Sequence, residues 1–313
     1  MTADSVTIVG VIGTGSMGSA LVKGWLRAEQ RGVRLIVWDK IEAAAQRLLT
    51  PGPISAARSL EDLVAQADLV LVVVKPKDAQ VVLGAIASLL REGQIVISSM
   101  AGITMGRIRT ILGPGPNLFR VMPNLGVEIG VGAIAVASEP GAAAAEVEAV
   151  IGLFAGLGVT ESVPEDMLDA VTAVSGSGPA FLALAVESLE DGAVAAGLPR
   201  VTARRLVRQT ALATARLLPL HSDSPGELAE HLAATPMDKA GMDVLEERGV
   251  RLAFQQAIEA AVQRSRRLRS AGPSQSPSPA GPPQEGRRQD GSSPDDEELP
   301  RLSPGRPCGP VFP

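Results

Sequence analysis

The sequence predicts an α/β fold, a doubly wound parallel sheet, followed by an all-α domain. Two observations carry this prediction. Between residues 6 and 160, short apolar runs alternate with helix-length amphipathic stretches, the pattern of a parallel sheet covered by helices on both faces. Beyond Pro164, long Ala- and Leu-rich segments with helical spacing take over, and we expect them to form a domain of helices alone.

The expected strands are rich in β-branched residues and lack strict alternation, as is typical of strands buried on both faces. The strongest candidates are residues 6–12, 35–38, 69–74 and 95–98, and weaker candidates are residues 118–121, 132–137 and 158–162. The first domain is therefore expected to span residues 1–162.

In the second domain, expected at residues 163–269, the helices are broken at Gly197-Leu198-Pro199, at Ser224-Pro225-Gly226 and near Gly249. Residues 167–196 are so continuously apolar that a helix there should be buried on most sides. In a small domain this indicates a subunit interface, and hence a homodimer. Residues 270–313 are rich in Pro and poor in aliphatic side chains, which predicts a disordered tail rather than a recognition motif.

The composition excludes several classes of protein. A net charge of −5 and a pI near 5.3 argue against a nucleic-acid partner, because phosphate binding depends on a positive surface. The single cysteine, Cys308, has no intramolecular disulfide partner. His221 and His231 lack metal-ligand spacing, so no metal is expected. No basic, apolar leader begins the chain and no stretch approaches a membrane span, so we expect a soluble cytoplasmic protein without a membrane partner.

A glycine-rich loop follows the first expected strand and opens a helix, the context in which G-x-G-x-x-G indicates dinucleotide binding. Its first glycine allows a tight turn, the second lets a pyrophosphate approach the backbone, and the third permits close packing of helix on strand. The helix N-terminus then faces the phosphates. This is the fingerprint of a Rossmann-type domain, and its residues are Gly13, Thr14, Gly15, Ser16, Met17 and Gly18.

Asp39 ends the second expected strand, where it is placed to accept hydrogen bonds from the ribose hydroxyls of a dinucleotide. Its charge should repel the 2′-phosphate of NADPH, which favours NADH. Lys40 beside it is either a phosphate ligand or an ordinary surface lysine, so both NADH and NADPH stay open as cofactors.

Three further segments end strands at the carboxyl edge of the sheet, where open α/β folds bind ligands. Lys75 and Pro76 either reach the cofactor or form a plain strand-ending turn. Ala101, Gly102 and the amide of Asn124 suit a nicotinamide pocket.

Hydroxyl groups and backbone N–H groups gather in residues 175–180, SGSGPA, at an expected helix start. A carboxylate could dock there; the alternative is that Ser177 is a simple N-cap. Glu165 and Asp166, at the domain junction, are either functional or first-turn acids that stabilise a helix N-terminus.

Taken together, the segments VGVIGTGSMGSALVKGWL, ADLVLVVVKPKD, ISSMAGIT, FRVMPN and DAVTAVSGSGPAFLALAVESLEDGAVAAGL resemble pyrroline-5-carboxylate reductases. Their order and spacing cover residues 6–268. The resemblance implies a Rossmann domain, a helical dimerisation domain whose helices intertwine between subunits, a homodimer or ring of dimers, and a role in proline biosynthesis with 1-pyrroline-5-carboxylate as substrate.

The resemblance also implies roles for single residues. Gly13 to Gly18 would hold the pyrophosphate, and Lys75, Pro76, Ala101 and Gly102 would line the nicotinamide side. Glu165, Thr172 and Ser177 would lie near the substrate as catalytic or binding groups, and Glu165 could stabilise an iminium ion electrostatically. Positioning of the two rings would supply much of the rate.

The sequence departs from the family in one loop, where the expected S-P-G-G-x-T is replaced by residues 234–239, ATPMDK. Asp238 would repel a substrate carboxylate, whereas Thr235 or Lys239 could replace the lost hydrogen-bond donors. At Leu125 the family's threonine hydroxyl is missing. These changes leave two alternatives open: a reductase for another cyclic imine or a keto or hydroxy acid, and a dinucleotide-binding protein without turnover.

Overall fold

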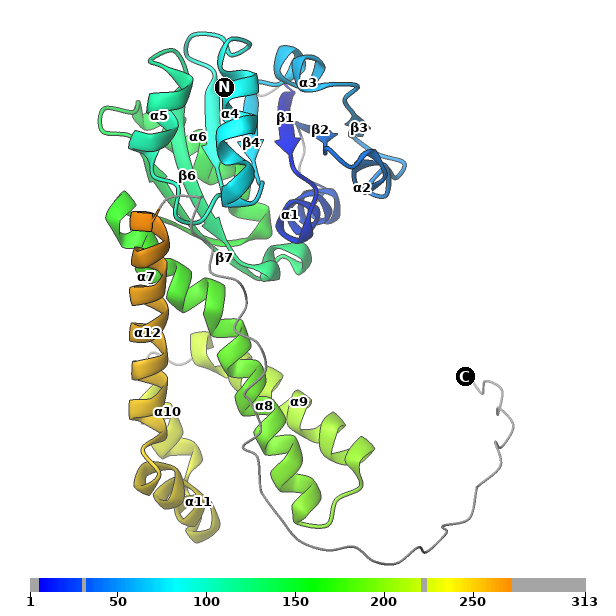
Figure 1. Cartoon of the computed structure of the whole chain (residues 1–313). Helices are drawn as coiled ribbons and strands as arrows, with labels where there is room; N and C mark the ends of the chain where they lie inside the picture. The colour runs from blue at the N-terminus through cyan, green and yellow to red at the C-terminus, as the bar shows by residue number, and fades with distance from the viewer. Residues whose placement is uncertain (1–5, 30–31, 221–223, 272–313) are drawn as a thin grey trace, which may run out of the picture. The chain divides into compact units, whose positions relative to one another are not determined.

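The computed structural model describes residues 6–29, 32–220 and 224–271, which form an eight-stranded sheet followed by helices (Figure 1). The strands are β1 (Thr7–Ile12), β2 (Val33–Trp38), β3 (Ile54–Ala56), β4 (Leu69–Val72), β5 (Ile95–Ser98), β6 (Asn117–Pro123), β7 (Gly132–Ser138) and β8 (Gly158–Ser162). The α-helices between them are α1 (Ser16–Arg27), α2 (Glu42–Gln46), α3 (Leu60–Gln66), α4 (Ala79–Ala87), α5 (Met105–Leu112) and α6 (Ala144–Phe154). Short 3-10 helices are η1 (Pro76–Asp78), η2 (Leu125–Ile129) and η3 (Ala155–Leu157).

The strand order is β3-β2-β1-β4-β5-β6-β7-β8, and β1 to β6 pair in parallel. The chain runs outward from β1 in one direction to β3, then returns to β4 and runs outward in the other direction. This reversal creates a crevice at the carboxyl ends of β1 and β4, where such sheets bind ligands. The predicted Rossmann-type fold is confirmed.

Three details of the sheet differ from the expectation. β7 is antiparallel to β6, because the connection over residues 124–131 is shorter than the dozen or so residues that a parallel crossover needs. β3 was not expected, since it is a three-residue edge strand in a Pro- and Gly-rich stretch. β4 ends at Val72 rather than at residue 74.

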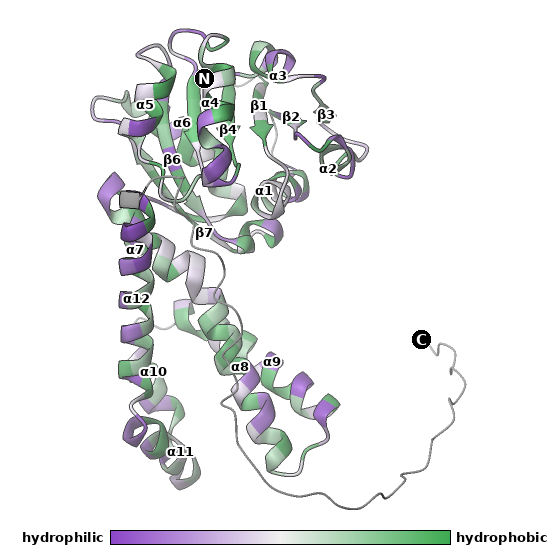
Figure 2. Ribbon diagram, viewed as in Figure 1, coloured by the Kyte–Doolittle hydropathy of each residue, from purple (hydrophilic) through white to green (hydrophobic). Residues whose placement is uncertain are grey.

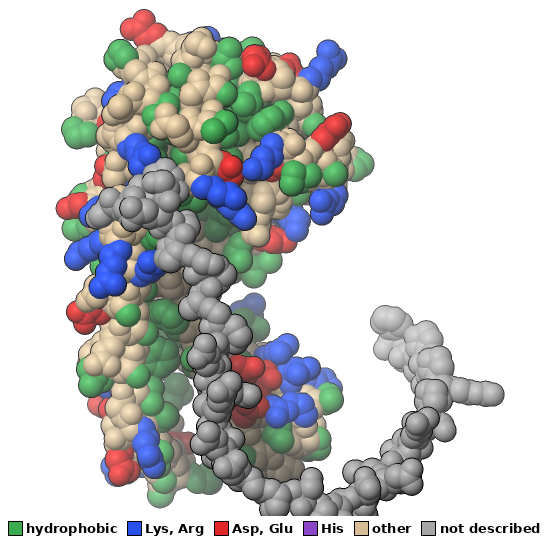
Figure 3. Space-filling model, in the orientation of Figure 1, with side chains coloured by type: hydrophobic (Ala, Val, Ile, Leu, Met, Phe, Trp, Pro, Cys, Tyr) green, Lys and Arg blue, Asp and Glu red, His purple; other side chains and the backbone are tan. Residues whose placement is uncertain are grey.

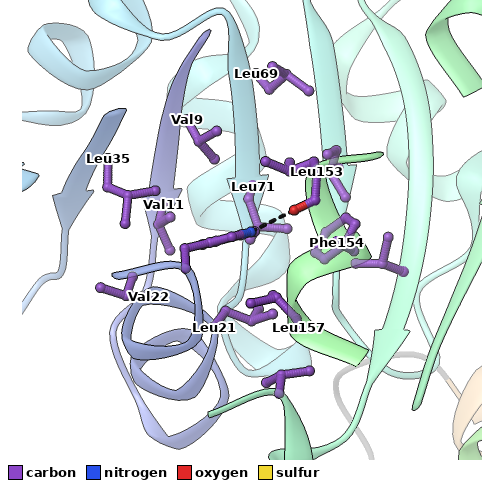
Figure 4. Close-up of a cluster of buried hydrophobic side chains, with 14 of the residues drawn as sticks. Val9, Val11, Leu21, Val22, Leu35, Leu69, Leu71, Leu153, Phe154 and Leu157 are labelled. Carbon is purple, nitrogen blue, oxygen red and sulfur yellow. Dashed lines mark hydrogen bonds between the residues drawn. The ribbon is translucent and has the colours of Figure 1, made fainter. Parts of the chain in front are cut away.

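The sheet has a hydrophobic cluster on each face. On one face, strand residues pack against α1 and α6, as in Figure 4, where Val11, Leu21, Leu71 and Phe154 come together. The buried indole of Trp25 donates from Nε1 to the Leu153 carbonyl oxygen at 2.7 Å. The other face packs against α3, α4 and α5. Helices thus cover both faces, as the continuous apolar strands predicted.

After Val163 the described chain is helical. Its elements are η4 (Glu165–Met167), α7 (Leu168–Val171), a π-helix (Thr172–Ser177), α8 (Gly178–Ala195), α9 (Arg200–Leu217), η6 (Leu218–Leu220), α10 (Pro225–Leu232), α11 (Pro236–Glu247) and α12 (Val250–Ala271). The three predicted breaks are present, and a further break at residues 233–235, between α10 and α11, was not predicted. The predicted tail lies outside the described residues, apart from its first two positions, which end α12.

The apolar stretch at α8 is not buried within the single chain. Leu182, Leu184 and Leu189 are each at least 60% exposed. Figure 2 marks hydrophobic positions along the helices, and Figure 3 shows hydrophobic side chains on the surface of the helical part. Contrary to the sequence expectation, Glu165–Ala195 is long and apolar enough by composition to cross a membrane, and it is the one such stretch among the described residues. Exposed apolar patches of this size also mark protein–protein interfaces. Here Glu190, inside the stretch, pairs with Arg208 of α9, so the stretch itself carries a charged pair.

Candidate dinucleotide and substrate site

The glycine-rich loop joins β1 to α1, and its three glycines differ in what surrounds them. Gly13 has φ +99°, and a Cβ there would lie 2.4 Å from the Val73 carbonyl oxygen. A Cβ on Gly18 would lie 2.0 Å from the Gly13 carbonyl oxygen. At Gly15, by contrast, a Cβ would meet no protein atom within 4 Å. The fold therefore requires the outer two glycines, whereas the middle one leaves space for a ligand at the N-terminus of α1.

A cavity of about 500 Å³ opens beside this loop and is lined by Gly13, Gly15, Asp39, Lys40 and Lys75, among others. The Asp39 carboxylate is held in a fixed orientation there. Its Oδ2 accepts hydrogen bonds from Thr14 N at 2.7 Å and Thr14 Oγ1 at 3.1 Å, and its Oδ1 accepts one from Ile41 N at 2.9 Å. The structure thus brings the fingerprint loop and the predicted ribose-binding acid to one cavity.

Lys40, for which the sequence left open a phosphate ligand or a surface lysine, makes an exposed ion pair within the protein. Its Nζ lies 3.2 Å from Oδ1 of Asp78 in an exposed ion pair. A larger cavity, about 810 Å³, is lined by Val6, Val33 and Pro51. It lies at the amino ends of β1 and β2, opposite to the glycine-rich loop, and so it is not the cofactor site.

Of the other sequence-predicted residues of the sheet edge, Gly102 lies close to the end of the last helix. Lys75 and Pro76 are exposed after β4, and Lys75 lines the same cavity as Asp39. Ala101 and Gly102 follow β5. A Cβ on Gly102 would come within 3.6 Å of the backbone of Leu268 and Arg269, so the C-terminal turn of α12 packs against this loop.

Asn124, expected to face the nicotinamide, uses both ends of its amide within the protein. Its Nδ2 donates to the Ser175 carbonyl oxygen at 3.1 Å, while its Oδ1 accepts from Gly126 N at 3.1 Å and Ala133 N at 3.2 Å. This side chain therefore joins the end of β6 to the helical part.

Glu165 lies at the start of the helical part, and one of its oxygens joins it to the sheet. Its Oε1 accepts from Met105 N at 2.6 Å and from Arg120 Nη1 at 2.9 Å. Arg120 is only 4% exposed. The sequence reasoning overlooked Arg120, although a charged residue inside the apolar strand LFRVMP is a signal that could have identified it.

The serine-rich segment forms a π-helix inside one continuous helical run, so Ser177 is not an N-cap and its side chain makes no capping hydrogen bond. Thr172 Oγ1 donates to the Leu168 carbonyl oxygen at 2.7 Å, and Ser175 Oγ donates to the Val171 carbonyl oxygen at 2.9 Å. The carbonyl oxygen of Ser175 accepts the hydrogen bond from Asn124. Short π-helical turns inside α-helices occur frequently at functional sites.

Asp169 in α7 ties this region to α12. Its Oδ1 accepts from Ser265 Oγ at 2.7 Å, and its Oδ2 forms a 3.0 Å ion pair, without hydrogen-bond geometry, with Arg269 Nη1. Asp169 is 6% exposed, so these two partners offset the cost of its burial.

Thr235 and Lys239 lie on α11 and make their described contacts within that helix. Thr235 caps it by accepting from Asp238 N, and Lys239 pairs with Asp243 at 3.5 Å. α11 precedes α12, whose 22 residues span about 33 Å before reaching Gly102. Within a single chain, these two residues are therefore not brought to the sheet edge. Among the described residues there is no cluster of His, Cys, Asp and Glu suited to a metal ion.

A Rossmann-type sheet with an open glycine-rich loop, a fixed acid in the adjoining cavity and an appended helical domain defines a nicotinamide-dependent oxidoreductase. Two family models match the chain: pyrroline-5-carboxylate reductase dimerisation over residues 165–268, and NADP oxidoreductase coenzyme F420-dependent over residues 8–102. The chain is 33% identical to the pyrroline-5-carboxylate reductase of Methanosarcina acetivorans, over 83% of this chain and 97% of that protein. It is 34% identical to that of Pisum sativum, over 85% and 97%. The chain belongs to the pyrroline-5-carboxylate reductase family.

Solved structures agree with this assignment. The crystal structure of the Streptococcus pyogenes 1-pyrroline-5-carboxylate reductase matches with a TM-score of 0.73 and 31% identity, over 84% of this chain and 99% of that one. The Plasmodium falciparum pyrroline carboxylate reductase, solved with NADP bound, matches with a TM-score of 0.74 and 26% identity, over 84% and 98%. The recognition of the family from its sequence motifs is confirmed.

Proposed function

We propose that this protein reduces 1-pyrroline-5-carboxylate to L-proline with NADH or NADPH, in proline biosynthesis. The observation that carries the proposal is the open approach to Gly15 beside the fixed carboxylate of Asp39, at the sheet edge to which Glu165 and the π-helix are attached. When bound, the dihydronicotinamide supplies a hydride from its C4 to the imine carbon of the substrate ring, which becomes C5 of proline. Protonation of the imine nitrogen makes that carbon electrophilic, and the nitrogen becomes the amine of proline.

The residues of the loop, Gly13 to Gly18, are proposed to hold the pyrophosphate through backbone N–H groups at the start of α1. Lys75, Pro76, Ala101 and Gly102 are proposed to line the nicotinamide side. Open space above Gly15 and the position of Lys75 in the same cavity support this assignment.

Glu165, Thr172 and Ser177 are proposed to surround the substrate. Oε1 of Glu165 is occupied by Met105 N and Arg120, so any electrostatic stabilisation of an iminium ion falls to Oε2, which has no partner among the described contacts. Thr172 and Ser177 lie at the two ends of the π-helix, five residues apart. Thr235 and Lys239 are proposed to reach the substrate site of a second subunit, because α12 separates them from the sheet edge of their own chain.

We further propose that NADH is preferred over NADPH. The Asp39 carboxylate is oriented by three hydrogen bonds in the cavity beside the glycine-rich loop, where it would accept from two ribose hydroxyl groups and repel a 2′-phosphate. Lys40 is paired with Asp78 and is thereby less available to neutralise that phosphate.

The assembly is proposed to be a homodimer or a ring of dimers, with Rossmann residues 1–162, dimerisation and substrate residues 163–269, and a tail at residues 270–313. The exposed leucines of α8 support a dimer, since a second subunit would remove them from water. A cytoplasmic location fits a nicotinamide-dependent enzyme of amino-acid biosynthesis.

The altered loop favours one alternative, a reductase for a different cyclic imine or a keto or hydroxy acid. Thr235 is used as a helix cap, and Asp238 places a negative charge beside it. The test measures oxidation of NADH and of NADPH, first with 1-pyrroline-5-carboxylate and then with a six-membered cyclic imine. It distinguishes the proposed function from a reductase with another substrate and from a non-catalytic protein. Turnover of the five-membered substrate supports the proposal, turnover of another substrate alone supports the alternative, and cofactor binding without turnover indicates a non-catalytic protein.

A further inference from the structure

We propose that Arg120 and Asn124 are positioning residues, which hold residues 165–177 against the sheet edge at the spacing that hydride transfer requires. The proposal rests on the proposed reductase function, because that spacing matters only if a ring bound by the sheet must meet a ring bound by the helical part. Neither residue needs to touch the substrate for this role.

The first attachment is the buried ion pair between Arg120 and Glu165. Arg120 lies in the middle of β6 with its guanidinium removed from water, and its Nη2 also lies 3.3 Å from the Met100 carbonyl oxygen. A buried guanidinium is strongly unfavourable without a charged partner. Among the described residues, Glu165 is its one ion-pair partner, at 2.9 Å. The charge on the strand therefore fixes where the helical part begins.

The same carboxylate oxygen is shared with a third element. Met105 N, the first N–H of α5, has no partner inside its own helix and donates to Glu165 Oε1 at 2.6 Å. The beginning of the helical part is thus fixed against both β6 and α5. A shift of Glu165 would leave a buried charge and a helix N–H unpaired at once.

The second attachment is the hydrogen bond from Asn124 to the carbonyl oxygen of Ser175, inside the π-helix. Arg120 lies in β6 and Asn124 follows its last residue, so the two attachments are four residues, or about 13 Å, apart along the strand. Their partners, Glu165 and Ser175, are ten residues apart, or about 15 Å along a helix. These similar spans allow a strand and a helical segment lying alongside each other to be joined at two points.

Thr172 lies between the two attachments and Ser177 directly beyond the second, so the proposed substrate groups sit on the part of the helix that is held most firmly. A displacement of about 1 Å at a reacting centre can cost about 100-fold in rate. Loss of either attachment should therefore lower kcat. Arg120 and Asn124 do not line the cavity beside the glycine-rich loop, and both side chains bond to groups within the protein, so NADH binding should be preserved.

The test compares Arg120→Met and Asn124→Asp with a matched control, Arg109→Met. Asp keeps the acceptor for Gly126 and Ala133 but cannot donate to Ser175. Arg109 pairs with Glu139 within the sheet domain and is not joined to the helical part. We expect kcat with 1-pyrroline-5-carboxylate to fall at least about 30-fold in both test variants, with the NADH dissociation constant within about threefold of wild type. Arg109→Met should lower the thermal midpoint and leave kcat within about threefold.

Unchanged kcat in both folded test variants would overturn the proposal while leaving the proposed function intact. A loss of NADH affinity in Asn124→Asp would instead make Asn124 a cofactor ligand and overturn its positioning role. If Arg120→Met does not fold, Arg120→Lys, which keeps the charge without the planar fork, should fold and show an intermediate kcat; wild-type kcat would count against the proposal. A wild-type protein that binds NADH without turnover would overturn both this proposal and the proposed function.

Discussion

Replacement of Gly15 by valine separates cofactor binding from folding more cleanly than any other change in the loop. A Cβ at Gly15 meets no protein atom, and its φ of −65° is accessible to every residue, so the new side chain enters only the space left for the ligand. Loss of about two charge-assisted hydrogen bonds between backbone and pyrophosphate, each about 1.5–3 kcal/mol, corresponds to a loss of NADH affinity of about 10² to 10⁴-fold.

The cost to stability should be small. Gly15 is the N-cap of α1, and valine is a poorer N-cap by about 1 kcal/mol, which lowers the melting temperature of a protein this size by about 2–4 °C. Gly18→Ala is the matched control. Its Cβ would lie 2.0 Å from a backbone oxygen, so it should destabilise the fold by about 1–3 kcal/mol or more.

The assay is a fluorescence titration with NADH, run beside thermal unfolding of the same samples. A Gly15→Val protein that binds NADH as tightly as wild type would refute the placement of the pyrophosphate at this loop. A Gly15→Val protein that unfolds like Gly18→Ala would refute the claim that the space above Gly15 is reserved for a ligand.

Three further predictions address the cofactor, the last helix and the core. Asp39→Asn keeps the shape and removes the charge that is proposed to face the 2′-phosphate, so the ratio of kcat/KM for NADPH to that for NADH should rise about tenfold or more; an unchanged ratio would contradict the assignment of Asp39. Removal of residues 270–313 keeps Arg269 beside Asp169 and should leave kcat within about twofold. Removal of residues 265–313 takes away both partners of the buried Asp169 carboxylate and should lower the free energy of unfolding by about 3–5 kcal/mol. Equal stability of the two truncated proteins in urea would show that these contacts contribute nothing. Trp25→Phe leaves the buried Leu153 carbonyl oxygen without its donor and should cost about 1–3 kcal/mol in urea unfolding without changing NADH affinity; a change below about 0.5 kcal/mol would mean that water replaces the indole.

Features that depend on the residues of one short segment were predictable from the sequence. Features that depend on contacts between distant segments were not. The β-branched runs at β1, β2, β4 and β5 and the spacing of Gly13, Gly15 and Gly18 identified the Rossmann half, because burial on both faces and close backbone approach each restrict residue type directly. The reversal of β7 was missed, since strand direction depends on the length of a connection rather than on the strand's own residues.

The same distinction applies to the residues of the candidate site. Asp39 was predicted to lie beside the loop and does so, because the carboxyl ends of neighbouring parallel strands meet at one edge. Asn124 lies at the predicted edge, but its contacts within the protein were not predicted, since no sequence pattern reveals that the Ser175 carbonyl oxygen lies opposite its amide. Arg120 escaped notice because its partner, Glu165, is 45 residues away in a different domain.

The π-helix at residues 172–177 sets the rotation of the following helix, α8, about its own axis. A π-turn carries one residue more than an α-turn, and each residue advances an α-helix by about 100°. If the same residues wound as a regular α-helix, with none deleted, the leucines of α8 would turn by roughly a quarter of a rotation relative to the sheet. The exposed leucines that are proposed to meet a second subunit would then point elsewhere, so this one turn links the orientation of the proposed substrate groups to the proposed contact between two chains.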